Sequence, residues 1–412
     1  MKVRIEPGLA MGKIVVPPSK SYAHRLLIAS ALSDEKSTVR NIVLSNDIQA
    51  TINCLETLGK KVEILDDDKS SNKKINISTI KSFDTLDEHL IFDCLESGST
   101  LRFFIPIALL TGKKIEFRGT EKLISRGIVP YEDICLKQNI KVIKTKTSIT
   151  FIGQLHSDEF IVPGNISSQF ITGLLFALPL LDGNSSIKII NNLESKNYID
   201  ITLDVLKQAG IIIEEQDKLY NIWGKQQYKA NDYFVEGDYS NAVFLDVFNY
   251  LGGVVDLIGL NPDSYQGDKV YKEYFELLCE GYQTLDLSNC IDLGPIMFGF
   301  SALKYGAKFI NTERLKIKES DRIAAVNAEI SKFGAKLHEF DNFVVIDKQI
   351  LDIPKSVLFG QNDHRIVMML AVMASVYGGI IDGAEAVNKS YPHFFKDLES
   401  LGIEVYYDVD ER

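Results

Sequence analysis

Basic side chains recur in the segments where apolar helices are expected to begin. Lys20 and Arg25 lie in SKSYAHR, Arg102 follows SGSTL, and Arg365 ends NDHR. A helix N-terminus exposes unpaired backbone N–H groups and about half a positive charge, so an added ammonium or guanidinium makes an anion site. Several such termini brought together would hold phosphate and carboxylate groups. The pattern therefore indicates a small, highly anionic ligand.

A second cationic segment, LKIKESDR, surrounds an acid. If this segment is helical, Lys318 and Arg322 are four residues apart and share a face, with Glu319 held among cations. Arg126, beside Gly127 in ISRGIVP, adds a guanidinium in an expected loop. A solvated, charged helix turn is the alternative interpretation of LKIKESDR.

The composition limits the classes of protein to which this chain can belong. The chain has 412 residues with a formal net charge of −11, and 45% hydrophobic with 25% charged residues is typical of a soluble globular protein. The negative net charge of the chain argues against a general nucleic-acid binder. The five cysteines form no C-x-x-C pair and no zinc-ligand pattern, which favours reduced thiols. The N-terminus MKVRIEPGLA has no apolar leader and no apolar run reaches membrane-spanning length, so we expect a cytoplasmic protein without membrane association.

Two elements recur along the chain with matching spacing. The first is an amphipathic run that ends in Gly or Asn and precedes a short strand, at Gly59, Asn139, Gly210, Gly281, Gly334 and Gly402. The second is a polar cluster that opens an apolar helix, at Ser19, Ser97, Ser167, Asp238, Asp292 and Asn362. Starts of the second series are 78, 70, 71, 54 and 70 residues apart, and the first series has the same short step. The spacing predicts six units, each with two helices and several strands; ordinary αβ alternation is the alternative.

Six units of this length exceed the usual size of one domain. Three units per domain would give two domains of ordinary size, and the segment around 235–237, after the third unit, is the natural boundary.

Nine short motifs occur in order over nearly the whole chain: PPSKSYAHR, ESGSTLR, SRG, GNISSQF, SKNYID, EGDYSNA, KESDR, QNDHR and KSYPHFF. Together they resemble the EPSP synthase family, the 3-phosphoshikimate 1-carboxyvinyltransferases. The resemblance implies an α/β fold in two domains, an inside-out α/β barrel of six βαβαββ units with helices inward and sheets outward. It implies a domain I of residues 1–18 plus 237–412, on the phosphoenolpyruvate side, and a domain II of residues 19–236, on the shikimate 3-phosphate side. The active site would lie in the interdomain cleft.

The resemblance also implies the reaction. The enolpyruvyl group of phosphoenolpyruvate would pass to the 5-hydroxyl of shikimate 3-phosphate through a tetrahedral intermediate, with release of phosphate, in the biosynthesis of chorismate and aromatic amino acids. It implies no cofactor and no metal, no nucleic-acid partner, a monomer, and domain closure on substrate binding.

Site residues follow from the motifs, position by position. For shikimate 3-phosphate the resemblance implies Ser21, Arg25, Ser167, Ser168, Gln169, Ser195 and Tyr198, with Gln169 also in contact with the second substrate. For phosphoenolpyruvate it implies Lys20, Gly98 through its backbone, Arg126, Arg322, Arg365 and Lys389, and Lys318 is a further substrate-binding residue. The expected catalytic residues are Asp292, which would engage the attacking hydroxyl and also bind substrate, Glu319 and Lys20. The assignment of each proton among these three stays open.

Several neighbours have supporting roles in this interpretation. His364 is expected to pack or to orient substrate rather than to act as a base, and Asp363 to cap its helix and orient Arg365. Asp47 is expected to support the site or cap a helix. Met368 and its neighbour Met369 are expected in the core.

Three alternatives stay in view. The UDP-N-acetylglucosamine 1-carboxyvinyltransferases share the architecture, but they usually bear a reactive Cys or Asp in a loop that corresponds to 111–130, which here contains neither. An RNA-terminal phosphate cyclase should be less acidic. A non-catalytic sensor of phosphorylated metabolites would not need the combination of Asp292, Glu319 and Lys20. Glu96 stands where many relatives of the EPSP synthase family carry Asn, so contacts near Gly98 are expected to differ.

Overall fold

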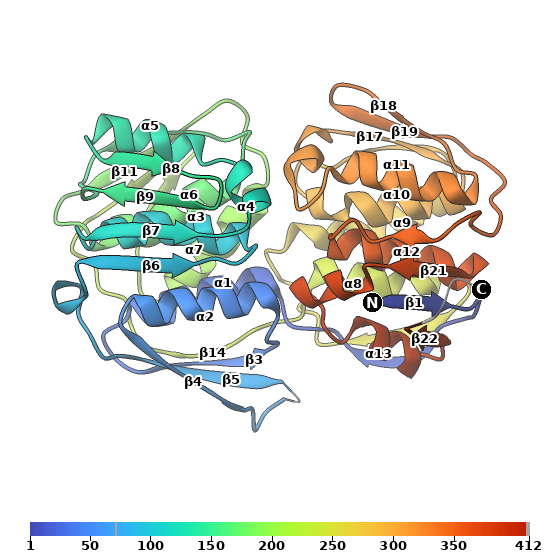
Figure 1. Cartoon of the computed structure of the whole chain (residues 1–412), viewed down its shortest axis with the longest axis horizontal. Coiled ribbons are helices and arrows are strands. Elements are labelled where there is room, and N and C mark those ends of the chain that lie inside the picture. The colour runs from blue at the N-terminus through green and yellow to red at the C-terminus, as the bar shows by residue number, and fades with distance from the viewer. Residues whose placement is uncertain (71, 409–412) are drawn as a thin grey trace. The chain divides into compact units, whose positions relative to one another are not determined.

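The computed structural model describes residues 1–70 and 72–408, and the chain divides into two units (Figure 1). Unit 1 comprises Met1–Pro17 and Gly237–Arg412, and unit 2 comprises Pro18–Glu236. The chain therefore passes from one unit to the other twice, within one residue of the boundaries expected from the motifs. No helix within the described residues is long and apolar enough to cross a membrane.

Unit 2 is built from three four-stranded sheets. In spatial order they are β14 (Asp232–Phe234), β3 (Ser37–Ile42), β5 (Lys73–Thr79), β4 (Lys60–Asp66); β6 (His89–Asp93), β7 (Lys114–Arg118), β9 (Ser148–Ile152), β8 (Lys141–Lys144); and β10 (Glu159–Pro163), β11 (Ser185–Ile190), β13 (Leu219–Ile222), β12 (Ile213–Gln216). In each sheet the first two strands are parallel and the last two form an antiparallel hairpin.

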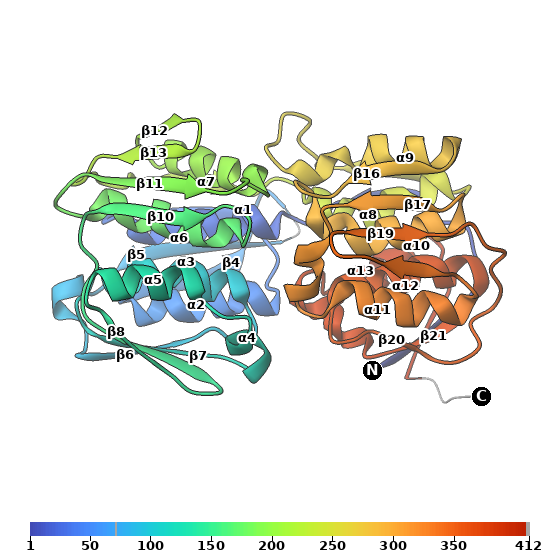
Figure 2. The same ribbon diagram turned by 90° about the horizontal axis from the view of Figure 1, so that it is seen from above.

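Helices connect these strands and fill the middle of unit 2. The central helices are α1 (Lys20–Leu32), α3 (Gly98–Leu109) and α6 (Ser168–Ala177), the last continued by the 3-10 turn η2 (Leu178–Leu180). The others are α2 (Asn46–Thr57), η1 (Phe83–Thr85), α4 (Glu121–Ser125), α5 (Val129–Lys137) and α7 (Lys196–Gln208). Figures 1 and 2 show the three sheets lying around α1, α3 and α6. A helix that is apolar on every side must be buried. Nearly all residues of these three central helices are buried.

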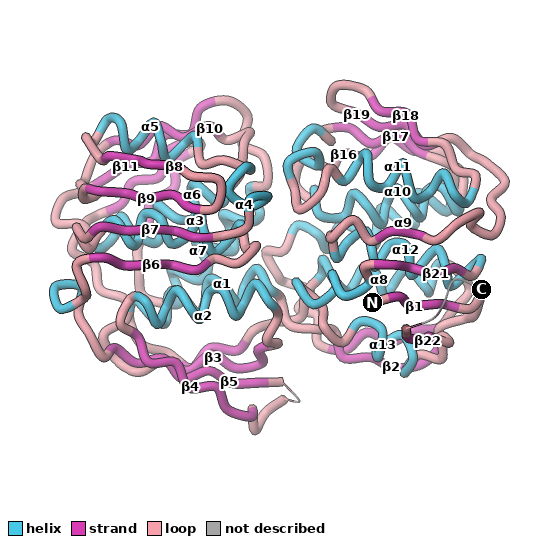
Figure 3. Tube along the Cα trace, viewed as in Figure 1, coloured by secondary structure: helices cyan, strands magenta, loops and turns pink. Residues whose placement is uncertain are grey.

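Unit 1 repeats this plan with one reduction. Its four-stranded sheets are β16 (Gln283–Asp286), β17 (Ala307–Ile310), β19 (Phe343–Ile346), β18 (Leu337–Glu339); and β20 (Leu358–Phe359), β21 (Gly379–Asp382), β1 (Lys2–Ile5), β22 (Val405–Tyr407). The third sheet has only β15 (Val254–Ile258) and β2 (Met11–Val15), which are parallel. Figure 3 shows the strands of each unit toward the outside, with helices behind them.

The helices of unit 1 follow the same alternation. The central ones are α8 (Tyr239–Asp246), α10 (Gly294–Leu303) and α12 (His364–Tyr377), and the others are α9 (Tyr271–Glu280), α11 (Arg322–Ile330) and α13 (Phe394–Ser400). Short 3-10 turns join them: η3 (Val247–Tyr250), η4 (Gly267–Val270), η5 (Ile291–Leu293), η6 (Glu313–Ile317), η7 (Ser331–Phe333) and η8 (Ala384–Lys389). Met368 and Met369 are fully buried on α12, as expected for core residues.

The short step in the repeat has a structural cause. In four of the other repeats a hairpin follows the second helix, and in the last repeat β22 follows α13 and pairs with β1. By contrast, α9 ends at Glu280 and β16 begins at Gln283. The expectation of six βαβαββ units is therefore wrong for one of them, because this repeat lacks its hairpin. Gly281 shows the same difference: it has extended backbone, with φ 160°, where the corresponding Gly59, Asn139, Gly210, Gly334 and Gly402 are left-handed.

Candidate active site

Two guanidinium groups converge on the first residue of α3. A Cβ built on Gly98 would lie 2.8 Å from Arg126 Nη1 and 2.9 Å from Arg102 Nη1. The helix begins here, with Ser97 Oγ accepting from Thr100 N as its N-cap. Free N–H groups at a helix start and two arginines beside them make a strong site for an anion. A side chain at position 98 would displace this guanidinium pair (Arg102 and Arg126), so the position requires glycine.

Gln169 connects the guanidinium pair to α6. Its Oε1 accepts from Arg102 Nη1 at 2.7 Å, and its Nε2 donates to Ser99 Oγ at 2.9 Å. Ser167 is the N-cap of α6 and accepts from the backbone N–H of Gln169, and Ser168 is the first residue of the helix. The starts of α3 and α6 are thus joined by side chains that reach between them.

Arg25 is a buried cation held by neutral acceptors. Its Nε donates to Thr202 Oγ1 at 2.8 Å, while its two terminal nitrogens donate to the carbonyl oxygens of Ser21 and Tyr198 at 2.8 and 2.9 Å. Burial lowers the pKa of the Arg25 guanidinium to about 10. No carboxylate among the described residues lies within ion-pairing distance of Arg25. The positive charge therefore stays available to an anionic ligand, since buried charges are normally paired.

The remaining residues predicted in unit 2 lie at the starts of α1 and α7. Lys20 opens α1, and its Nζ donates to Asp47 Oδ2 at 2.9 Å. Asp47 therefore supports Lys20, whereas the N-cap of α2 is Ser45. Ser195, which is 2% exposed, precedes α7 with φ 56°, a left-handed conformation that is uncommon for serine. Such strained positions cluster at functional sites.

A chain of buried hydroxyls and one imidazole ties the helix starts of unit 2 together. His24 Nδ1 lies 2.7 Å from Thr51 Oγ1, which lies 2.9 Å from Thr100 Oγ1, which in turn donates to Ser97 Oγ at 2.7 Å. Burial lowers the pKa of His24 well below its usual value, and Lys20 and Arg25 lower it further. His24 is therefore neutral, and this network links α1, α2 and α3 without adding charge.

In unit 1, three cations surround Asp292. Its Oδ1 accepts from Arg322 Nη1 at 2.8 Å and lies 3.1 Å from Lys318 Nζ, and its Oδ2 lies 3.4 Å from Arg365 Nη2. Burial opposes ionisation of Asp292, but Lys318, Arg365 and Arg322 outweigh it and hold its pKa well below the usual range. Asp292 is ionised at neutral pH. It lies in η5 just before α10 and does not cap that helix.

Arg322 organises the acids of this cluster. The side chain is 1% exposed and, besides Asp292, it donates to Glu319 Oε2 at 2.8 Å and to Asp363 Oδ2 at 2.9 Å. Burial lowers the pKa of Arg322, yet Asp363, Glu319 and Asp292 raise it by more, so it stays charged. Asp363 caps α12, as expected. Its carboxylate accepts from the guanidinium of Arg322, whereas from Arg365 it accepts the backbone N–H and not the guanidinium.

The segment LKIKESDR does not form one helix. Lys318 is extended at the end of η6, and α11 begins only at Arg322, so the expected i, i+4 face is wrong. Lys318 and Arg322 nevertheless meet, because both reach the same oxygen of Asp292. Burial lowers the pKa of Lys318, although the charge of Asp292 opposes the shift.

The other predicted residues of unit 1 lie around the start of α12. Arg365, 3% exposed, donates to the carbonyl oxygen and the Oγ of Ser240, at 2.9 and 3.0 Å. Lys389, 8% exposed at the end of η8, donates to the carbonyl of Asn362 at 2.7 Å. His364 is the first residue of α12 and is 2% exposed.

Two residues that sequence reasoning left out of the site now belong to it. The sequence marks Arg102 as a cation at a helix start, but not as a site residue. Arg102 follows Gly98 by four residues, as Arg25 follows Ser21, and this spacing could have identified it. Ser240 gave no such signal, because its contact with Arg365 spans 125 residues. No group of His, Cys, Asp and Glu in residues 1–70 and 72–408 is arranged to hold a metal ion.

Comparison with known proteins identifies the family to which this chain belongs. The sequence model of the family "EPSP synthase (3-phosphoshikimate 1-carboxyvinyltransferase)" matches residues 6–398. The chain belongs to the EPSP synthase family. Two curated relatives named 3-phosphoshikimate 1-carboxyvinyltransferase are 41% identical, from Clostridium novyi (strain NT), and 39% identical, from Clostridioides difficile (strain 630). Each comparison covers 97% of this chain and 97% of the relative.

Solved structures establish the fold independently of close sequence similarity. An EPSP synthase from Acinetobacter baumannii superposes with a TM-score of 0.76 at 19% identity, covering 98% of this chain and 99% of the other. A second structure of EPSP synthase from this organism gives 0.77 at 17% identity, covering 99% and 100%. The two-domain α/β fold expected from the motifs is thus the fold of the EPSP synthase family.

Proposed function

We propose that this chain is a 3-phosphoshikimate 1-carboxyvinyltransferase that acts in the biosynthesis of aromatic amino acids. It transfers the enolpyruvyl group of phosphoenolpyruvate to the 5-hydroxyl of shikimate 3-phosphate and releases phosphate. Relatives that bear this name match over almost the full length of the chain. The two substrates are small and strongly anionic, which is the ligand class that the cationic helix starts favour.

The guanidinium pair at Gly98 carries the proposal. Phosphoenolpyruvate has a phosphate and a carboxylate on the same carbon atom, and arginines bind both groups in a bidentate manner. Arg126 Nε is buried without a hydrogen-bond partner among the described residues, which an anion at this position would supply. Lys20, Lys318, Arg322, Arg365 and Lys389 are the further cations that we assign to this substrate.

Shikimate 3-phosphate is assigned to the other helix starts of unit 2. Arg25, Ser167 and Ser168 would take the phosphate, because one is a buried cation without a carboxylate and two lie at the start of α6. Ser21, Gln169, Ser195 and Tyr198 complete the set assigned to this substrate. Residues of both units would then serve one reaction, and the expected position of the site between two domains stays a prediction.

The charge states suggest how the reaction divides among the catalytic residues. Asp292 is ionised and would accept a hydrogen bond from the attacking hydroxyl, orienting it toward the enol carbon. A carboxylate with a low pKa is a weak base, which favours an orienting role for Asp292. Glu319 and Lys20 would exchange protons at the transferred group and its bridging oxygen. We further propose a cytoplasmic monomer that closes on substrate.

Phosphate release tests the function directly. Purified protein with phosphoenolpyruvate should release phosphate when shikimate 3-phosphate is added and not when UDP-N-acetylglucosamine is added. Release with the nucleotide sugar would assign the other carboxyvinyltransferase activity. No release with either acceptor, together with binding of shikimate 3-phosphate by calorimetry, would assign a sensor.

A further inference from the structure

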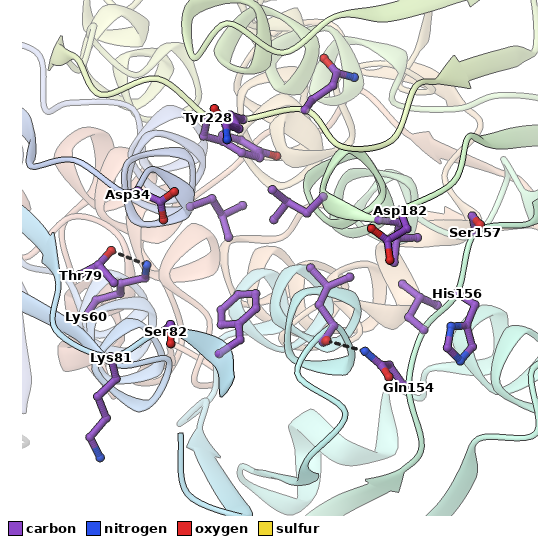
Figure 4. Close-up of a pocket in the computed structure, with 18 residues that line it drawn as sticks. Asp34, Lys60, Thr79, Lys81, Ser82, Gln154, His156, Ser157, Asp182 and Tyr228 are labelled. Carbon is purple, nitrogen blue, oxygen red and sulfur yellow. Dashed lines mark hydrogen bonds between the residues drawn. The ribbon is translucent and has the colours of Figure 1, made fainter. Parts of the chain in front are cut away.

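Unit 2 contains a cavity of about 520 Å³ at the end of its central helices that is remote from the candidate site (Figure 4). Leu32 is the last residue of α1, Leu110 follows α3, and Leu180 ends the turn that continues α6, and all three line the cavity. The predicted substrate residues lie at the opposite ends of the same helices. A helix of twelve or thirteen residues is about 18–20 Å long, so the cavity is a separate place.

Apolar side chains make up much of the cavity wall. Besides the three leucines at the helix ends, the wall includes Phe83, Leu155, Leu181 and Tyr228. The hydroxyl of Tyr228 is engaged by the carbonyl of Phe176 at 2.7 Å, so the tyrosine presents its ring. Polar side chains, among them Gln154, His156 and Gln226, share the wall with these residues, so the cavity offers both apolar surface and hydrogen-bonding groups. Small-molecule sites combine these two features.

One buried cation lies in this wall. Lys60 is 7% exposed, and its Nζ donates to Thr79 Oγ1 at 2.8 Å, while that hydroxyl donates to the carbonyl of Ser33. An ammonium has three N–H groups, and Thr79 takes one. No carboxylate among the described residues lies within 4.0 Å of Lys60 Nζ, and burial lowers the pKa of Lys60 although the charge of Asp34 opposes this. A buried ammonium that no carboxylate contacts is costly unless an anion is supplied.

The rim of the cavity limits how much negative charge can enter. Asp34 and Asp182 line the cavity and are exposed, and Figure 4 shows them on opposite sides of it, with Asp34 on the side of Lys60. The other lysine, Lys81, is exposed and lies 3.6 Å from Asp87. Two rim carboxylates and one buried ammonium favour a ligand with a single negative charge.

We propose that this cavity binds a small monocarboxylic acid with an apolar body. Its carboxylate accepts hydrogen bonds from the two remaining N–H groups of Lys60, and its body lies against the leucines at the helix ends. The site differs in chemistry from the candidate active site, where several arginines and helix starts favour phosphorylated dianions.

Calorimetric titration of the intact protein with 3-phenylpropionate tests this proposal, with 3-phenylpropan-1-ol as the uncharged analogue. The acid should bind at least tenfold more tightly than the alcohol. Lys60→Met, which keeps the length and the apolar stem of the side chain, should weaken the acid at least tenfold and leave the alcohol unchanged. Lys141→Met, an exposed lysine on β8, is the matched control and should bind both probes as the wild type does.

Two results would overturn the proposal. Equal binding of acid and alcohol to the wild-type protein, or binding of neither, would remove the role of Lys60 without any need for a variant. Displacement of the acid by phosphoenolpyruvate would place it among the cations of the candidate active site instead. If the acid stays bound at saturating phosphoenolpyruvate, the two sites are separate. A saturation-transfer NMR experiment under that condition should show transfer from the methyl groups of the protein to the phenyl ring of the acid.

Discussion

Arg322 Nη1 donates to Asp292 Oδ1 at 2.8 Å, although the two residues are 30 positions apart. The same guanidinium holds Glu319 and Asp363, so one arginine gathers three carboxylates. Two of these acids, Asp292 and Glu319, are the carboxylates assigned to catalysis. Arg322 therefore holds both carboxylates in place and favours the ionised form of Asp292, in addition to any contact it makes with substrate.

Neutralising Asp292 should remove turnover and spare binding. Asp292→Asn keeps the shape of the side chain but loses the charge that engages the attacking hydroxyl, so kcat should fall by about 10² or more. The dissociation constant of shikimate 3-phosphate, measured by calorimetry, should change by less than about threefold, because its proposed phosphate ligands lie in unit 2. Asp256→Asn, an exposed acid paired with Lys13, is the control. Wild-type kcat in Asp292→Asn would refute the assigned role.

A methyl group at position 98 should weaken binding of phosphoenolpyruvate more than binding of shikimate 3-phosphate. In Gly98→Ala the new Cβ would force the flexible ends of Arg102 and Arg126 away, which leaves the fold intact. Loss of a charged hydrogen bond is worth about 1.5–3 kcal/mol, so KM for phosphoenolpyruvate should rise about tenfold to a hundredfold. Steady-state kinetics with each substrate varied would measure this.

The control for that variant is Gly8→Ala, whose Cβ would make ordinary contact with Ile403. It should behave as wild type. A rise in KM for shikimate 3-phosphate equal to that for phosphoenolpyruvate would contradict the assignment of the guanidinium pair.

Removing the charge of Asp363 should cost stability in a pH-dependent way. Asp363 is fully buried against Arg322, and breaking such a pair costs about 3–5 kcal/mol. Asn is as good an N-cap as Asp, so Asp363→Asn tests the charge and not the cap. Burial opposes ionisation of Asp363, but Arg322 and its hydrogen bonds lower the pKa in the folded state. A lowered folded-state pKa gives stability that is present above the unfolded pKa of about 4 and lost as pH falls through the folded value.

Urea unfolding at several pH values measures this effect. The difference in free energy of unfolding between wild type and Asp363→Asn should be full at pH 7 and shrink below about pH 4. Asp341→Asn, an exposed acid of the same unit, should stay within about 0.5 kcal/mol of wild type. A difference that does not depend on pH would mean that the loss is one of packing.

The buried network of unit 2 should contribute to stability through Thr51. Thr51→Val has nearly the same volume, but it leaves His24 Nδ1 and Thr100 Oγ1 without their shared partner. Leaving buried polar groups unsatisfied costs about 1–3 kcal/mol, so the urea midpoint should fall by a corresponding amount. Thr147→Val on an exposed turn should leave the midpoint unchanged. An unchanged midpoint in Thr51→Val would show that the network is not needed for stability.

Local patterns in the sequence determined the repeated plan. N-cap residues such as Ser97 and Asp363, and left-handed closing residues such as Gly210, are local signals that act within one turn of helix. The same is true of cations placed at helix starts. Repetition of these signals predicted two domains of three repeats, and the short step marked the repeat that lacks its hairpin.

Tertiary structure decided which side chains meet. Nothing local shows that Arg102 reaches Gln169, that Ser240 receives Arg365, or that Lys60 reaches Thr79 in the wall of a cavity. These contacts join residues 19 to 125 positions apart and depend on how helices and strands pack, so no spacing rule encodes them. The i, i+4 face expected at Lys318 and Arg322 is absent, because η6 ends at Ile317 and α11 begins only at Arg322. The two side chains meet instead through the tertiary contact of both with Asp292.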